Sequence, residues 1–311
     1  MKRKILCIDG GGIKGIYPAQ FLAEIEKKLN CKICNYFDMI VGTSTGGIIA
    51  AALAMGIPAT TICQLYSKHA TDIFPQNKQV IRSLKRIIGA KYKNEALKKH
   101  LISIFKNSTM SDCKTRLLIP SYNLTTGAIR VFKTPHSDDL YFDKKARIVD
   151  VLLATTAAPT YLPPYKTKSG TFIDGGIGAN NPTFIGLVEG VSRCGWALDD
   201  IFLLSLGCVE TLNNVTTGYE KMGFNNVAKI ISLFMNAESQ YSDNIAKILL
   251  GNEQYLRINS LNPDNRVSLD KSSDEALNYL KQIGKSKAQE NIHVINRIFF
   301  DTPIEKSYTD N

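Results

Sequence analysis

Long hydrophobic runs are absent from this sequence of 311 residues. No stretch reaches the roughly 18 uninterrupted apolar residues that a membrane-spanning helix needs. The first apolar run, Ile5 to Ile8, is too short for the hydrophobic part of a secretory signal peptide and leads directly into polar residues and glycines. These absences argue against an integral membrane or secreted protein, and we expect a soluble, cytoplasmic chain that starts near Met1.

The sequence also lacks a regular cysteine pattern. Its seven cysteines form an odd count, and the C-x-x-C pair of Cys31 and Cys34 has no second pair to complete a zinc site. A disulfide framework and a four-cysteine zinc site are therefore not expected. We interpret the cysteines as reduced intracellular thiols.

Charge is present but unevenly placed. The chain carries a formal charge of +10, and the stretch from Gln76 to Arg116 alone holds eleven lysines and arginines against Glu95 and Asp112. We call residues 78–116 the basic segment. Apolar residues are interleaved with its basic ones, which suits an anionic membrane surface or a nucleic acid. A solvated helical face has the same composition, so all three interpretations stay open here.

The first sixty or so residues have the pattern of a β-α-β-α unit. In such a unit the crossover is right-handed and the strands run parallel, so their carboxyl ends emerge at the same edge of the sheet. The loop at Gly10 and the turn at Ser44 are therefore expected to be neighbours. The apolar periodicity predicts strands over residues 4–9 and 36–41 and helices over 16–29 and 48–55.

The remainder of the chain continues the mixture of strands and helices. Because no internal repeat or linker divides it, we expect one α/β domain over residues 1–300 and a polar tail over 301–311. Within the domain, a motif-bearing core covers about 4–207 and a helical part about 225–300. Predicted strands cover residues 116–122, 129–133, 171–174 and 201–206, and predicted helices cover 147–157, 225–250 and 274–299.

A G-x-S-x-G pattern, Gly42 to Gly46, lies between a predicted buried strand and a predicted helix, which is the place of a nucleophile elbow. A serine on such a sharp turn has a strained backbone, and glycines two residues before and after it relieve the crowding. The helix that follows favours negative charge developing at the hydroxyl. Ser44 is therefore the candidate nucleophile.

A serine nucleophile needs a proton acceptor, usually a histidine. None of the four histidines follows a buried strand and a tight loop, so each is interpreted as structural or exposed. These are His69, His100, His136 and His293. Asp174 is the better candidate, because it ends a predicted strand and precedes Gly175 and Gly176. Burial would raise its pKa from near 4 and make it a stronger base, whereas an ordinary Asp-Gly turn is the structural alternative.

The glycine loop after the first strand offers backbone amides with no side chains in the way. Gly10, Gly11 and Gly12 lie at the start of a helix, where amides can bind a tetrahedral oxyanion. With Gly15 they also satisfy G-x-G-x-x-G, the pattern of a dinucleotide site. The acidic residue that such a site needs at the end of the second strand is missing, and no P-loop lysine follows.

Three blocks of this sequence, in this order, resemble those of the patatin-like phospholipases, lipid acyl hydrolases with a serine/aspartate dyad. The blocks are Asp9 to Gly15 (DGGGIKG), Gly42 to Gly46 (GTSTG) and Asp174 to Gly176 (DGG). Further similarity lies in Ala154 to Pro164 and in Asp174 to Pro182. The likeness therefore runs from about Lys4 to Gly207.

The resemblance implies a three-layer α/β fold, with a mostly parallel central sheet and helices on both faces. It further implies Ser44 as nucleophile, Asp174 as base and Gly10 to Gly12 as oxyanion hole, with no cofactor and no metal in the chemistry. Lys14 occupies the basic position of that loop. The glycines that support the three motifs are Gly15, Gly42, Gly46, Gly175 and Gly176.

The chain also resembles the phospholipase effectors of cyclic-nucleotide anti-phage systems, through Tyr36 to Asp38 and Asp72 to Pro75. That resemblance makes a cyclic dinucleotide a candidate activator, although no residue identifies a nucleotide pocket. We expect hydrolysis of membrane phospholipids, with the basic segment at the inner face of the membrane and no nucleic acid bound. A nucleotide-binding or nucleic-acid-binding module without hydrolysis, an esterase for soluble acyl donors, and an oligomer stay open as alternatives.

Overall fold

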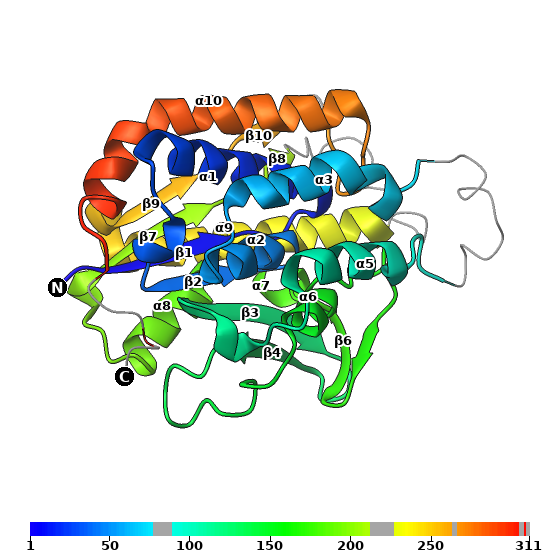
Figure 1. Cartoon of the computed structure of the whole chain (residues 1–311), viewed down its shortest axis with the longest axis horizontal. Helices are drawn as coiled ribbons and strands as arrows, with labels where there is room; N and C mark the ends of the chain where they lie inside the picture. The colour runs from blue at the N-terminus through cyan, green and yellow to red at the C-terminus, as the bar shows by residue number, and fades with distance from the viewer. Residues whose placement is uncertain (77–88, 212–226, 263–265, 305–307, 309–311) are drawn as a thin grey trace.

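The computed structural model describes residues 1–76, 89–211, 227–262, 266–304 and 308. Strands and helices alternate along these residues, and the expected elements form within a few residues of their predicted bounds (Figure 1). The strands are β1 (Arg3–Ile8), β2 (Met39–Gly42), β3 (Arg116–Asn123), β4 (Ala128–Lys133), β5 (Tyr165–Thr167), β6 (Gly170–Asp174), β7 (Ile201–Leu206), β8 (Glu210–Thr211), β9 (Tyr255–Ile258) and β10 (Leu261–Asn262). The helices are α1 (Ile16–Leu29), α2 (Thr45–Ala54), α3 (Ala59–Ile73), α5 (Asn94–Phe105), α6 (Ile148–Thr155), α7 (Gly176–Ala179), α8 (Thr183–Ser192), α9 (Val227–Gln254) and α10 (Asp274–Phe299).

The central sheet is mostly parallel, as the sequence predicts. Strand β1 pairs in parallel with β2 on one side and with β7 on the other, and β3 and β9 extend the parallel part outward. Strands β4, β5 and β6 join by antiparallel pairing. Strand β9 has no counterpart among the predicted elements, because four half-buried residues at the end of a long helix give too short a pattern to stand out.

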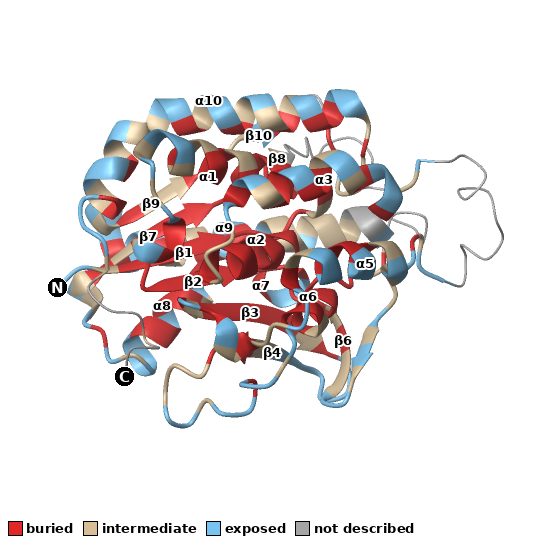
Figure 2. Ribbon diagram, in the orientation of Figure 1, coloured by how far each residue is buried: buried red, intermediate tan, exposed pale blue. Residues whose placement is uncertain are grey.

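Helices cover both faces of this sheet, which confirms the three-layer fold. Because side chains alternate along a strand, β1 contributes Leu6 and Ile8 to one core cluster and Ile5 and Cys7 to a second one. The first cluster lies under α1, α2, α3, α5, α6 and α10, and the second under α8 and α9. The strands β1, β2 and β7 between them are almost entirely buried (Figure 2).

The two ends of the chain pack together. Helix α10 runs along α1 (Figure 1), so closely that a side-chain carbon on Gly284 would lie 2.6 Å from the Tyr17 carbonyl oxygen. The Lys4 ammonium donates to Asp301 at 2.8 Å, so the tail begins attached to the body rather than frayed as its polar composition suggests. These contacts support our proposal that residues 1–300 form one domain.

Strand β6, which ends at Asp174, runs antiparallel to β3 and therefore also to β1 and β2. Strand β4 takes one edge of β3, so β2 and β6 share the other, β2 beside Leu118 and β6 beside Ser121. The two strands thus run toward each other, and the residues after β2 meet the last residue of β6.

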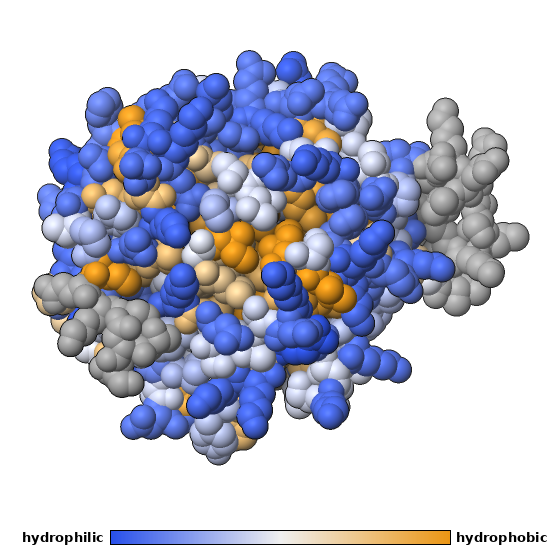
Figure 3. Space-filling model, viewed as in Figure 1, coloured by the Kyte–Doolittle hydropathy of each residue, from blue (hydrophilic) through white to orange (hydrophobic). Residues whose placement is uncertain are grey.

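Hydrophobic residues gather on the surface around α2 and α6, and hydrophilic residues surround them (Figure 3). Helices α3 and α5 lie on the same face (Figure 1). Among the helices that the structure describes, none is long and apolar enough to cross a membrane.

Candidate active site

Ser44 lies on a strained turn between β2 and α2. Its backbone angles are φ 53° and ψ −121°, a combination that L-residues rarely adopt. Side-chain carbons on the flanking glycines would collide with the backbone: on Gly42 with the Gly46 oxygen at 2.2 Å, and on Gly46 with the Ile8 oxygen at 2.3 Å. The G-x-S-x-G spacing is thus a steric requirement of this turn.

The Ser44 hydroxyl donates a hydrogen bond to the Asp174 carboxylate, with 2.6 Å between Oγ and Oδ2. Both residues are buried, and the Gly176 amide donates to the other carboxylate oxygen at 2.7 Å. Burial raises the pKa of Asp174 to about 6, although the bonds from Ser44 and Gly176 oppose the rise. A carboxylate of this pKa is a stronger base than one in water and is still ionised at neutral pH.

Two threonines, Thr43 and Thr155, position the nucleophile. Neither stands out as a functional residue in the sequence. Thr155, from α6, accepts a hydrogen bond from the Ser44 amide at 3.0 Å and donates to the Pro120 carbonyl at 2.6 Å. The Thr43 hydroxyl donates to the Ala179 carbonyl at 2.6 Å. Thr155 lies in the family-like stretch Ala154 to Pro164, but only the fold brings its hydroxyl to the elbow.

The glycine loop lies beside the elbow, as the order of elements predicts. Gly12 has φ +57°, and a side-chain carbon there would lie 2.2 Å from the Leu269 carbonyl oxygen. At Gly15 a side-chain carbon would lie 1.8 Å from Thr45 Cγ2, in the first turn of α2. The close approach to the elbow therefore requires glycine at position 15, and the positive φ together with the contact with Leu269 requires it at position 12.

The three amides of the expected oxyanion loop differ in what they bind. The Gly10 amide donates to the Asn180 carbonyl at 3.0 Å, so it is already engaged and is not available as an oxyanion donor. Gly11 and Gly12 line the cavity next to Ser44, and their amides have no backbone acceptor in the described part of the chain. Gly10 instead provides clearance, because a side-chain carbon there would lie 2.6 Å from Asn180 Oδ1.

Two cations fix the outer side of the loop. The Lys14 ammonium donates to the Val209 carbonyl at 2.9 Å, and burial lowers the pKa of this lysine. Asp9, which begins the loop, forms a two-point ion pair with Arg257 of β9, at 2.7 and 3.3 Å. Lys14, at the basic position of the loop, thus binds a backbone carbonyl, and Arg257 has no signal in the sequence.

An apolar cavity opens beside the dyad. It encloses about 720 Å³, part of it open to solvent, and Ser44 and Asp174 lie in its wall. Apolar side chains from α2, α3, α5, α9 and the loop after α6 line most of it, among them Ile48, Tyr66, Phe74, Leu97, Leu162 and Met235.

The histidines are engaged elsewhere. The His136 ring is fully buried and contacts Thr134 and Glu189 through its two nitrogens. His69 and His100 stack on each other, and His293 is exposed on α10. No histidine is a hydrogen-bond partner of Ser44 or Asp174, which agrees with a site that uses a carboxylate base.

The basic segment is described only in part, because residues 78–88 of it lie outside the described residues. Within the described part, Lys91 pairs with Asp270 and Arg116 lies over the Trp196 ring. Leu97, Leu101 and Phe105 of α5 face the core and are not available to a bilayer, whereas Ile102 is exposed. Exposed lysines on or beside α5 are Lys93, Lys98, Lys99 and Lys106.

Comparisons with known proteins point in one direction. A family model described as patatin-like phospholipase matches residues 6–187. A cGAMP-activated phospholipase of Pseudomonas aeruginosa is 34% identical over 291 residues, which cover 92% of this chain and 87% of the relative. A cGAMP-activated phospholipase of Escherichia coli is 32% identical, and the match covers 92% of this chain and 88% of that relative. The crystal structure of VipD from Legionella pneumophila matches with a TM-score of 0.51 at 15% identity, over 94% of this chain and 67% of that one, which supports the fold alone.

Proposed function

Because this chain belongs to the patatin-like phospholipase family, a family of serine hydrolases that act on carboxylic esters, we propose that it releases fatty acids from membrane phospholipids with Ser44 as nucleophile and Asp174 as base. The observation that carries the proposal is the 2.6 Å hydrogen bond from the Ser44 hydroxyl to a buried carboxylate in the wall of an apolar cavity. The hydroxyl is the nucleophile and the carboxylate is the base that accepts its proton. The cavity can hold an acyl chain of the substrate.

Acylation begins when the Ser44 oxygen attacks the ester carbonyl carbon and its proton passes to Asp174 Oδ2. The negative charge that develops on the carbonyl oxygen is bound by the Gly11 and Gly12 amides, and the dipole of α2 adds to this stabilisation. Collapse of the tetrahedral intermediate breaks the ester bond, and the leaving lysophospholipid alcohol takes the proton from Asp174. The acyl chain is left as an ester on Ser44.

Deacylation reverses the proton path. Asp174, ionised again, accepts a proton from a water molecule that attacks the acyl-enzyme carbonyl. The same two amides bind the second oxyanion. Ser44 recovers its proton as the fatty acid leaves, so the cycle needs no group beyond the dyad, the amides and water.

The test is fatty-acid release from phospholipid vesicles, measured by mass spectrometry, together with labelling by a fluorophosphonate. We expect the label on Ser44, and Ser44→Ala should lower release about 10⁶-fold while the fold is kept. Ser108→Ala, on a serine outside the site, is the matched control and should leave labelling and release unchanged. Release that persists in Ser44→Ala would remove this serine from the mechanism.

We further propose that a cyclic dinucleotide activates this chain, which would place it in anti-phage defence. The support is that relatives similar over most of its length are named cGAMP-activated phospholipases. Vesicle assays with and without a panel of cyclic dinucleotides test this, and at least one should raise fatty-acid release. Equal release with every member of the panel would contradict activation but not hydrolysis.

We also propose peripheral docking on anionic lipid at the cytoplasmic face of the membrane, through the exposed lysines of the basic segment. Because these charges are in contact with solvent, salt should screen their attraction to the lipid. Co-sedimentation with anionic vesicles should therefore weaken steadily as salt rises. Salt-independent co-sedimentation would indicate that another surface binds the membrane.

A further inference from the structure

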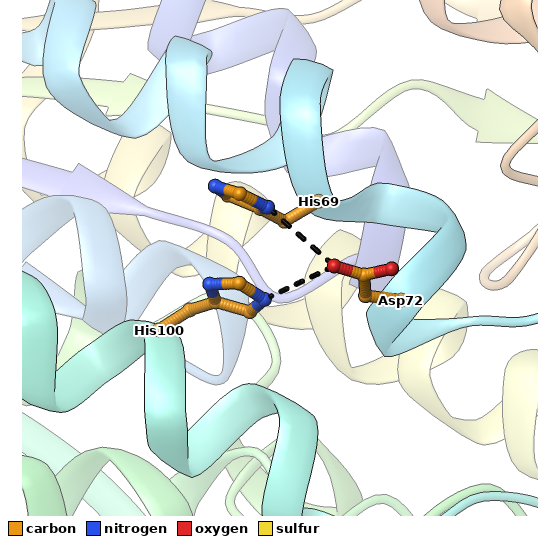
Figure 4. Close-up of side chains that lie close together, drawn as sticks. All are labelled: His69, Asp72 and His100. Atoms are coloured by element: carbon orange, nitrogen blue, oxygen red, sulfur yellow. Dashed lines mark ion pairs between the residues drawn. The ribbon is translucent and has the colours of Figure 1, made fainter.

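Two histidines and an aspartate meet at the junction of α3 and α5, away from the dyad. Asp72 Oδ2 lies 3.6 Å from His69 Nδ1 and 3.5 Å from His100 Nε2, and the three atoms are within 4.8 Å of one another. The two rings stack with 3.9 Å between their centroids, and the carboxylate faces both (Figure 4). Neither the family resemblance nor the acyl-transfer chemistry assigns these residues a role.

We propose that His69, Asp72 and His100 bind a divalent transition-metal ion of the zinc class. Imidazole nitrogens and one carboxylate are ligands that zinc and its neighbours prefer, whereas calcium and magnesium favour sites made of oxygen alone. Around a tetrahedral zinc ion with bonds of about 2.1 Å, neighbouring ligand atoms lie about 3.4 Å apart. The two observed distances to Asp72 have this spacing.

The same distances are poorly suited to a metal-free cluster. At 3.5 and 3.6 Å, both nitrogen-oxygen contacts are longer than good hydrogen bonds. A bound cation would bring the carboxylate and the two rings together without requiring charged imidazoles to stack.

The position of the cluster gives the ion a structural role. Asp72 directly precedes Ile73, and His100 lies one turn after Leu97, and both of these neighbours line the apolar cavity. A metal bound here would join α3 to α5 at the wall of that cavity. The Asp72 and His69 side chains are 61% and 38% exposed, so water can reach an ion bound between them.

The test uses the full chain without an affinity tag, stripped with a chelator and titrated calorimetrically with zinc chloride. One zinc ion should bind per chain and raise the melting temperature, and magnesium or calcium at the same concentration should do neither. Cobalt(II) should give the visible absorption of a four-coordinate site. None of these readouts depends on hydrolysis, so this proposal and the proposed function can fail independently.

Three variants decide whether these residues are the ligands. His100→Gln and Asp72→Asn should each weaken zinc binding at least tenfold. Even the loss of a residue that only hydrogen-bonds to a metal ligand lowers metal affinity by about tenfold or more. His293→Gln, on an exposed histidine of α10, is the matched control and should bind as the parent does. If His100→Gln does not fold, the exposed Asp72→Asn variant decides alone. Zinc binding that is absent in the parent, unchanged in Asp72→Asn, or lost equally in His293→Gln would overturn the proposal.

Discussion

Asp9 and Asp174 are two buried carboxylates at the same edge of the sheet, one just after β1 and the other at the end of β6. Each is 3% exposed, and burial raises the pKa of each to about 6. Their partners differ. Asp9 forms a two-point ion pair with Arg257, whereas Asp174 binds a serine hydroxyl and a backbone amide, with no cation in contact.

The difference shows what a raised pKa can and cannot indicate. Burial is the largest cause of the raised pKa at both sites, and it outweighs even the opposing charge of Arg257 at Asp9, so a raised pKa does not identify the catalytic group. The two sites differ in whether the partner of the carboxylate can give up its proton. Asp174 faces a hydroxyl that can give its proton up beside an open cavity, whereas Asp9 holds a guanidinium that remains protonated. Asp9 should therefore support the fold of the glycine loop, and Asp174 the reaction.

The largest expected effect is on turnover. Asp174→Asn keeps the shape of the side chain but cannot accept the Ser44 proton, so fatty-acid release should fall about 10⁴-fold. The variant should remain folded, because the amide group can still bond to Gly176 and Ser44. Release per folded molecule, measured on vesicles and calibrated by circular dichroism, checks both points. Asp9→Asn is the matched comparison. A comparable loss of turnover in that variant would contradict the assignment of a structural role to Asp9 and a catalytic role to Asp174.

The second effect is on stability, and here Asp9 should matter more than Asp174. Asp9→Asn leaves the Arg257 charge buried, with only Glu210 and Asp243 at 3.6 and 3.9 Å to compensate it. We expect the free energy of unfolding to drop by about 3 kcal/mol, the order found when one partner of a buried pair is removed. Urea denaturation measures this. Asp200→Asn, which breaks an exposed pair with the amino terminus, should cost less than about 1 kcal/mol.

A smaller effect is expected from Thr155, which holds the Ser44 amide beside Asp174. Thr155→Val keeps the shape but leaves the Ser44 amide and the Pro120 carbonyl without their partner. A small displacement of the nucleophile can cost about 10²-fold, so kcat should fall by that order with KM little changed. Thr155→Ser restores the hydroxyl and should recover most of the rate. Equal rates for the two variants would show that the hydroxyl does not position Ser44.

Much of this site could be predicted from sequence, and the reasons for the exceptions are physical. The elbow and the glycine loop are recognisable in the sequence, because steric limits at Gly42, Gly46 and Gly12 require glycine there. At Gly46 and Gly12 the limiting atoms belong to Ile8 and Leu269, but the requirement still appears in the sequence as a glycine. The order of elements then made loop and elbow neighbours. Asp174 was identified correctly as a neighbour of Ser44. The sequence did not indicate that β6 is antiparallel and meets β2 end to end beside β3.

What the sequence could not supply depends on contacts between distant segments. Arg257 reaches Asp9 across 248 positions, and Thr155 reaches Ser44 across 111. A lone arginine in a short strand and a threonine at a helix end are common, so neither stands out until the sheet is assembled. The engagement of the Gly10 amide by Asn180 is equally invisible, because it joins two backbones.

The pH dependence gives the smallest effect and separates the two carboxylates most directly. Asp174 must be ionised to accept a proton, so kcat/KM should be level above pH 6 and fall about tenfold for each unit below it. Stability should change in the opposite sense. A carboxyl whose pKa is raised by folding contributes stability at low pH, and this contribution is lost as the pH rises from about 4 to about 6. The chain is therefore expected to lose stability over the range in which it gains activity. Asp9→Asn should leave the pH profile of activity unchanged, because the Asp9 carboxylate takes no proton from Ser44. A pH profile that shifts in Asp9→Asn would reverse the roles assigned to the two residues.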